Sequence, residues 1–105
     1  MSWLYLLLAG LFEIGWPVGM KVAQGTEHRI LGLALSILCL GLSGLLLWQA
    51  QKEIAMGTAY AVWTGIGAAG TFLLGVWLFG DAGSLGRYLG VLLIIAGVVT
   101  LKLAQ

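Results

Sequence analysis

Four long apolar runs, separated by short polar breaks, are the feature that most constrains how this chain can fold. The runs cover roughly residues 3–20, 30–50, 54–79 and 85–103. At a rise of about 1.5 Å per residue, a helix of about 20 residues crosses the ~30 Å hydrocarbon core of a bilayer. Transmembrane strands would need alternating segments of about ten residues, and the runs lack that alternation. The pattern therefore predicts an all-α membrane protein with four short transmembrane helices joined by tight loops.

The composition excludes several other classes of protein. Of the 105 residues, 61% are hydrophobic and 9% are charged, whereas a soluble domain is about 25% charged. We therefore expect a single four-helix transmembrane domain over residues 1–105. A net charge of +1 gives no case for a nucleic-acid partner. The loops are too short for a catalytic site, so we expect no enzyme, and neither a metal-ligand set around His28 nor a cofactor is indicated. The first run follows no basic segment, which favours a retained helix over a cleaved signal peptide.

One carboxylate, Glu13, lies in the middle of the first apolar run. A charged group at that depth costs roughly 2.5–3.5 kcal/mol on insertion scales, so such residues usually face a cavity and serve a function. At helical spacing Glu13 shares a face with Gly10, Trp16 and Pro17. A carboxylate beside a Trp ring, with a glycine leaving room, predicts a binding site for a small organic cation. The alternative is a structural Glu13 that pairs with a basic residue to hold helices together.

The second and third runs add polar and aromatic groups to this prediction. Tyr60 and Trp63 are three residues apart and hence share a helix face. Trp offers the strongest cation–π surface, worth about 0.5–2 kcal/mol. The alternative is an interfacial aromatic belt, although Trp63 lies well inside its run. Ser43, in the middle of the second run, is expected either to hydrogen-bond Glu13 across helices or to bond back to the carbonyl four residues earlier.

Pro17 bears on the same site, because it has no N–H to donate to the carbonyl of Glu13. In lipid such a carbonyl should find another donor. We therefore expect either an extra acceptor beside the carboxylate or a tolerated kink without a role in binding.

The basic residues divide almost evenly between the two sides of the membrane. With four spans, Lys52 and Lys102 fall on the side of both termini, while Lys21, Arg29 and Arg87 fall on the other. An excess of Lys and Arg normally sets orientation. Because neither side has a clear excess of basic residues, the chain could insert in one fixed orientation or in both orientations. Two copies in opposite orientations would form an inverted pair.

Four helices around one carboxylate make too small a structure to enclose a pathway, so we expect an oligomer. Gly86 and Gly90 form a G-x-x-x-G motif in the fourth run, and Gly97 follows seven residues later. Small residues at such spacing let helix backbones approach closely. With 17 glycines in the chain, the same spacing also arises without a contact.

At these residues the whole chain resembles the small multidrug resistance transporters. The resemblance rests on A-G-L-F-E-I-G-W in the first run, G-T-A-Y-A-V-W-T-G-I-G in the third, and Gly90 with Gly97 in the fourth. Within that family the chain is more similar to the guanidinium exporters than to the exporters of polyaromatic cations. The positions that carry this distinction are Gly10, Trp16, Ser43 and Lys102, while Pro17 departs from the expected alanine.

The resemblance implies an antiparallel, dual-topology homodimer in the bacterial inner membrane, with Glu13 of both copies in one central site. It also implies proton-coupled antiport by alternating access. Glu13 would bind the proton and the cation, and Gly90 with Gly97 would contribute the dimer contact. The implied pocket is lined by Gly10, Trp16, Ser43, Tyr60 and Trp63.

The sequence thus favours a proton-coupled exporter of guanidinium and small, singly substituted guanidinyl cations. A carboxylate takes either a proton or a cation, and a flat guanidinium matches its two oxygens with parallel N–H donors. Two alternatives remain: a promiscuous exporter of quaternary ammonium and other drug cations, and a membrane subunit that uses Glu13 only for assembly.

Overall fold

The computed structural model describes residues 1–25 and 27–104, which form four helices. Each is long and apolar enough to cross a membrane, which confirms the predicted all-α membrane fold. Their ends agree with the predicted runs to within a few residues. The largest difference is at the end of the first helix, which continues past Met20 through Lys21. A lysine stem can lie along an apolar helix while its amine reaches the interface. The helices are α1 (Ser2–Ala23), α2 (Arg29–Ala50), α3 (Met56–Phe79) and α4 (Leu85–Ala104).

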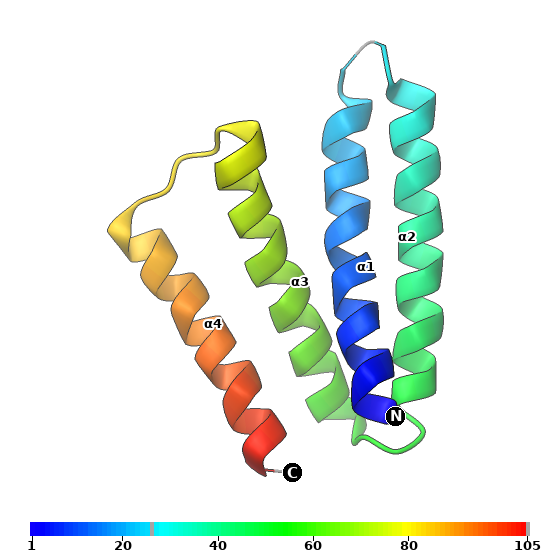
Figure 1. Ribbon diagram of the computed structural model, residues 1–105, viewed down its shortest axis with the longest axis vertical. Helices are drawn as coiled ribbons and strands as arrows, with labels where there is room; N and C mark the ends of the chain where they lie inside the picture. Colours follow the sequence, from blue (N-terminus) through cyan, green and yellow to red (C-terminus); the bar gives the residue numbers. More distant parts are fainter. Residues whose placement is uncertain (26, 105) are drawn as a thin grey trace.

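The helices lie side by side in a thin layer, in the spatial order α2, α1, α3, α4 (Figure 1). The layer measures 45 × 34 × 16 Å, and its shortest dimension is close to the ~10–12 Å diameter of a single helix. Both termini lie at one end of the layer, together with the loop between α2 and α3 (Figure 1). α1 and α3 therefore run parallel to each other and antiparallel to α2 and α4. This arrangement places α1 between α2 and α3.

Glycines set the close approach of α1 and α2. A Cβ added at Gly32 would lie 2.6 Å from the carbonyl oxygen of Gly19 and 2.6 Å from the backbone nitrogen of Ala23. No side chain fits between these two backbones. Lipid tails are as apolar as the helix surfaces, so transmembrane helices associate through such close packing of small residues.

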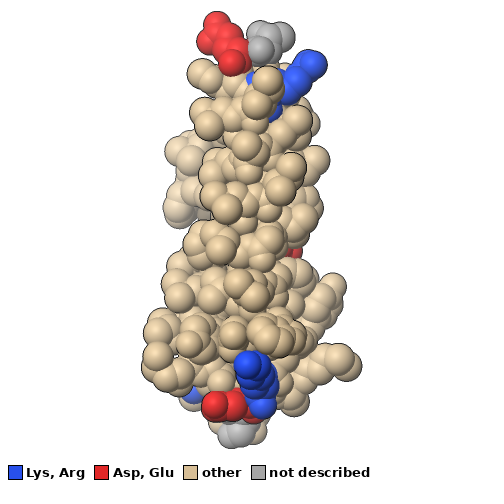
Figure 2. All heavy atoms as spheres, turned by 90° about the vertical axis from the view of Figure 1, so that its right-hand side faces the viewer, with Lys and Arg blue, Asp and Glu red and all other residues tan. Residues whose placement is uncertain are grey.

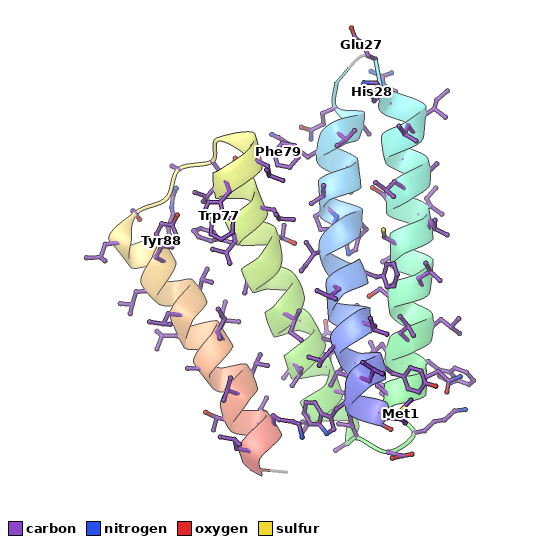
Figure 3. All side chains as sticks on the ribbon, viewed as in Figure 1. Met1, Glu27, His28, Trp77, Phe79 and Tyr88 are labelled. Atoms are coloured by element: carbon purple, nitrogen blue, oxygen red, sulfur yellow. The ribbon has the colours of Figure 1, made fainter. Side chains whose placement is uncertain are left out.

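α4 is the most peripheral helix: it packs mainly on α3, and it reaches α1 where Lys102 lies against Trp3. Tyr88, labelled at the start of α4 in Figure 3, meets Phe72 of α3 edge-on, with the ring centroids 5.6 Å apart. A Cβ at Gly65 would come within 2.6 Å of Val98, so the two helices also approach closely further along. Among the described residues of α4 only Val91 is buried. Val98 and Leu101 are partly buried against the core, and most of the other residues of this helix are apolar and exposed on the surface of the protomer.

The molecular surface matches a protein immersed in lipid. On the face shown in Figure 2, charged side chains gather almost entirely at the two ends, and a broad uncharged belt separates them. At the end with the termini, the Lys52 amine lies 4.6 Å from the Trp48 ring centroid and the Lys102 amine 4.7 Å from that of Trp3. Tryptophan and lysine are typical anchors at the membrane–water interface. This end of the layer therefore lies at the interface.

Candidate functional site

Glu13 lies partly buried in the middle of α1, with its carboxylate held by Trp16. The indole Nε1 of Trp16 donates to Oε1 of Glu13 over 2.6 Å. The contact is local, because residues three apart share a helix face. The described partner of Glu13 is thus an indole and not a lysine or arginine, which weakens the structural ion-pair alternative. An N–H donor to a carboxylate stabilises it without neutralising its charge.

The backbone of α3 closes over the other side of this carboxylate. A Cβ added at Gly67 would collide with Cγ of Glu13, and one at Gly10 would lie 2.7 Å from Cγ2 of Ile66. The room that the sequence predicts at Gly10 is therefore filled by Ile66 in this structure. Both glycines set a close approach of α1 and α3, and α3 stays helical through its glycine-rich centre. That Gly10 lines a substrate pocket stays a prediction.

The structure corrects the predicted partner of Ser43. Its fully buried hydroxyl donates to the carbonyl of Ala9 over 2.7 Å, and Nε1 of Trp63 donates to the same hydroxyl oxygen over 2.7 Å. A hydroxyl has one proton, which here goes to Ala9. The expected hydrogen bond to Glu13 and the alternative bond within α2 are thus both replaced. The reason is register: Ala9, one turn before Glu13, faces Ser43 across the helix pair.

A second serine, Ser36, acts in the same way and the sequence reasoning missed it. Its buried hydroxyl donates to the carbonyl of Trp16 over 2.7 Å. Ser36 and Ser43 are seven residues apart on one face of α2, and their acceptors Ala9 and Trp16 are seven apart on α1. The spacing of two serines over about two helical turns was the available signal. These two hydrogen bonds fasten α1 to α2 on both sides of Glu13.

The two aromatic residues of α3 are arranged differently from each other. The Trp63 ring is half-buried and fixed by Ser43, whereas the Tyr60 side chain is 56% exposed on the surface of the protomer. Their ring centroids are 5.4 Å apart, with planes inclined at 45°. Trp63 precedes Gly67 by one turn, and Trp16 follows Glu13 by one turn. The carboxylate therefore lies between two indoles along the helix axes.

The two glycines of the predicted dimer contact and Lys102 lie away from the carboxylate, whereas Pro17 lies one helical turn from it. A Cβ at Gly90 or Gly97 would meet nothing within 4 Å, so this face of α4 is open in the protomer. Lys102 lies against Trp3, ten residues and so about 15 Å along α1 from Glu13. Pro17 is accommodated inside α1, which continues to Ala23. The dimer contact at Gly90 and Gly97 stays a prediction.

Comparison with known proteins gives consistent matches over the chain. Residues 1–94 match the family described as Small Multidrug Resistance protein. The chain is 45% identical over 105 residues to a "Guanidinium exporter" of Yersinia pseudotuberculosis serotype I, covering 100% of both chains. It is 44% identical over 104 residues to the "Guanidinium exporter" of Salmonella typhimurium, covering 99% of this chain and 98% of the relative. The protein of that name from Proteus vulgaris is 42% identical over 108 residues, with 100% of both chains covered.

The matches and the fold agree. Four helices suited to crossing a membrane, together with bacterial relatives of the same length, make this a multi-pass membrane protein, consistent with the bacterial inner membrane. Because the family match covers most of the chain and the relatives align from end to end, the chain belongs to the Small Multidrug Resistance family.

Proposed function

We propose that this protein is a proton-coupled antiporter that exports guanidinium and small, singly substituted guanidinyl cations, and that it acts as a transporter and not as an enzyme. The observation that carries the proposal is the half-buried Glu13, at mid-length of a membrane-spanning helix, whose described partner is a single indole donor. A mid-membrane carboxylate without a permanent counter-cation is suited to exchanging protons for cations. The full-length relatives named "Guanidinium exporter" support the choice of substrate.

The chemistry of exchange follows from the geometry. A guanidinium presents two parallel N–H groups that match the two oxygens of a carboxylate. One of these oxygens already accepts from Trp16, so an incoming guanidinium replaces or shares that hydrogen bond. The indole ring is then placed to contact the flat cation, as is Trp63 one turn away on α3. Protonation of Glu13 removes the charge that holds the cation, so one carboxylate serves both ions in turn.

In a single protomer Glu13 lies in a layer about one helix thick, which cannot enclose a pathway. The proposal therefore includes a homodimer. Its copies are antiparallel, with dual topology, and the four helices of each copy form one domain. The exposed face of α4 around Gly90 and Gly97 offers the contact between them. The nearly equal numbers of basic residues at the two ends support insertion in both orientations. In such a pair, exchanging the conformations of the two copies opens the site to the other side of the membrane, which is alternating access.

Proteoliposomes test the function directly. Purified protein should carry guanidinium against its gradient when a proton gradient is imposed, and Glu13→Gln should abolish this flux while retaining the helical fold, because Gln cannot titrate. Glu53→Gln, an exposed carboxylate in the loop before α3, is the matched control and should transport normally. Proton-driven guanidinium flux that survives Glu13→Gln would refute the mechanism.

A further inference from the structure

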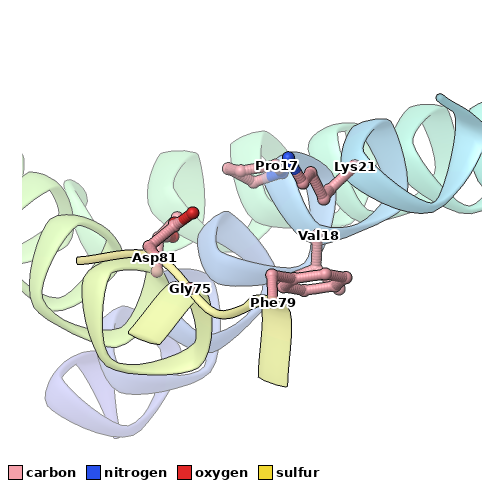
Figure 4. Close-up of a pocket in the computed structure, with 7 residues that line it drawn as sticks. Pro17, Val18, Lys21, Gly75, Phe79 and Asp81 are labelled. Carbon is pink, nitrogen blue, oxygen red and sulfur yellow. The ribbon is translucent and has the colours of Figure 1, made fainter. Parts of the chain in front are cut away.

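A cavity of about 150 Å³ opens between α1 and α3, beyond Glu13 toward the end of the layer opposite the termini. A protein cavity of that size accepts a benzene molecule, which is larger than guanidinium. The residues that line it include one acidic and one basic side chain, Asp81 and Lys21. Figure 4 shows Lys21 of α1 and Asp81 of the segment after α3 on two sides of this space, with the Phe79 ring nearby. Figure 3 shows Phe79 turned from the end of α3 toward α1.

The cavity lies along the same two helices as the Glu13 site and begins one helical turn beyond it. Since α1 and α3 run parallel, equal steps along both helices keep residues level with each other. Glu13 and Gly67 are in contact; four residues further, Pro17 and Thr71 both line the cavity. Another four residues bring Lys21 and Gly75, again both in its lining. The cavity thus begins one turn above the carboxylate, at Pro17, and leads to the polar end of the helices at Lys21, which is about 12 Å along α1 from Glu13.

The carboxylate of Asp81 is built into this cavity by the end of α3. Gly80 adopts a left-handed conformation (φ 71°), and the backbone N–H of Asp81 donates to the carbonyl of Gly75 over 3.0 Å. The turn folds the Asp81 side chain back over the helix, where a Cβ at Gly75 would collide with its Oδ2. A carboxylate at a helix C-terminus lies at the negative end of the helix dipole, and this end therefore favours a cation.

We propose that this cavity is an outer binding site for the exported cation, in which Asp81 and the Phe79 ring hold a guanidinium-type ion next to the path to Glu13. Lys21, which lines the same cavity, is the positive side chain with which the arriving cation competes for Asp81. The proposal rests on the proposed function and adds a second cation-binding site to the transport path. Since the proposed dimer is antiparallel, one such cavity lies at each face of the membrane.

Opposite effects of the two charges distinguish this role from a structural ion pair. If the cation competes with Lys21 for Asp81, then Asp81→Asn raises the KM for guanidinium and Lys21→Gln lowers it, each by about two- to fivefold, the range expected for one exposed charge pair. Solid-supported-membrane electrophysiology measures both values. Glu27→Gln is the matched control, because Glu27 is an exposed carboxylate in the loop at the same end (Figure 3). The KM of this variant for guanidinium should equal that of the wild type. Shifts of the same sign for the Asp81 and Lys21 variants, or an equal shift for Glu27→Gln, would overturn the proposal.

Direct binding separates the outer site from the central one. In Glu13→Gln protein, an NMR titration with guanidinium chloride should give saturable amide shifts at Gly75, Gly80 and Asp81, relative to sodium chloride of equal ionic strength. Adding Asp81→Asn should abolish them, and Gly75→Ala, which displaces the Asp81 carboxylate, should weaken them. Non-saturating shifts, or shifts unaffected by Asp81→Asn, would refute the outer site even if the wild-type protein transports guanidinium. Saturable binding without transport by the wild type would instead refute the proposed function alone.

Discussion

Replacing Ser43 by alanine should destabilise the protein more than its single hydroxyl suggests. The Ser43 hydroxyl donates to the Ala9 carbonyl and accepts from the Trp63 indole. Losing the first bond costs about 0.6 kcal/mol, the average for an interhelical hydrogen bond in a membrane protein. The second loss leaves the Trp63 N–H without its acceptor, and an unsatisfied buried donor costs about 1–3 kcal/mol. The free energy of unfolding should therefore fall by about 1.6–3.6 kcal/mol in Ser43→Ala.

Ser36→Ala is the matched comparison, since Ser36 is also buried in α2 but makes a single hydrogen bond, to the Trp16 carbonyl. Its cost should be about 0.6 kcal/mol. Unfolding of the purified protein in mixed micelles, followed by circular dichroism, measures both values.

A double-mutant cycle makes the reasoning refutable. In a Trp63→Phe background no indole N–H remains to be orphaned, so Ser43→Ala should there cost only about 0.6 kcal/mol. The coupling between Ser43 and Trp63 is then about 1–3 kcal/mol. Additive effects of the two substitutions would show that the Trp63–Ser43 hydrogen bond contributes nothing to stability.

Three further outcomes are expected. Gly67→Ala should reduce guanidinium transport and destabilise the fold by about 1–3 kcal/mol through overpacking against Glu13. Gly44→Ala is the control, because a Cβ there meets open space in α2; it should leave stability unchanged or raise it by up to ~1 kcal/mol. Equal losses of stability in the two variants would contradict the packing argument. Reporter fusions at the C-terminus should give signal on both sides of the membrane, whereas a single orientation would refute dual topology for this chain alone. Electrophysiological currents for tetraphenylphosphonium should fall below those for guanidinium and methylguanidinium, because the bulky ion has no N–H for Glu13 and must displace Trp16; equal or larger currents would favour the drug-exporter alternative.

The sequence by itself determined what depends on chain length and local spacing. Run length predicted the four helices because the bilayer fixes how many apolar residues a span needs. The pairing of Glu13 with Trp16 followed from their separation of three residues on one helix. The separation of Tyr60 and Trp63 likewise predicted that they share a helix face, where the structure places their ring centroids 5.4 Å apart.

Only the tertiary structure decided which groups meet across helices. The sequence offered Glu13 as partner of Ser43, but the register of α1 against α2 brings Ala9 there instead. The presence of Lys21 and Asp81 in the lining of one cavity likewise depends on α1 and α3 running parallel and level. Helical periodicity fixes the face on which a residue lies, but not its height relative to a neighbouring helix. That height is set by where backbones approach most closely, at contacts such as Gly19 with Gly32 and Gly67 with Glu13, because in lipid it is close packing that holds helices together.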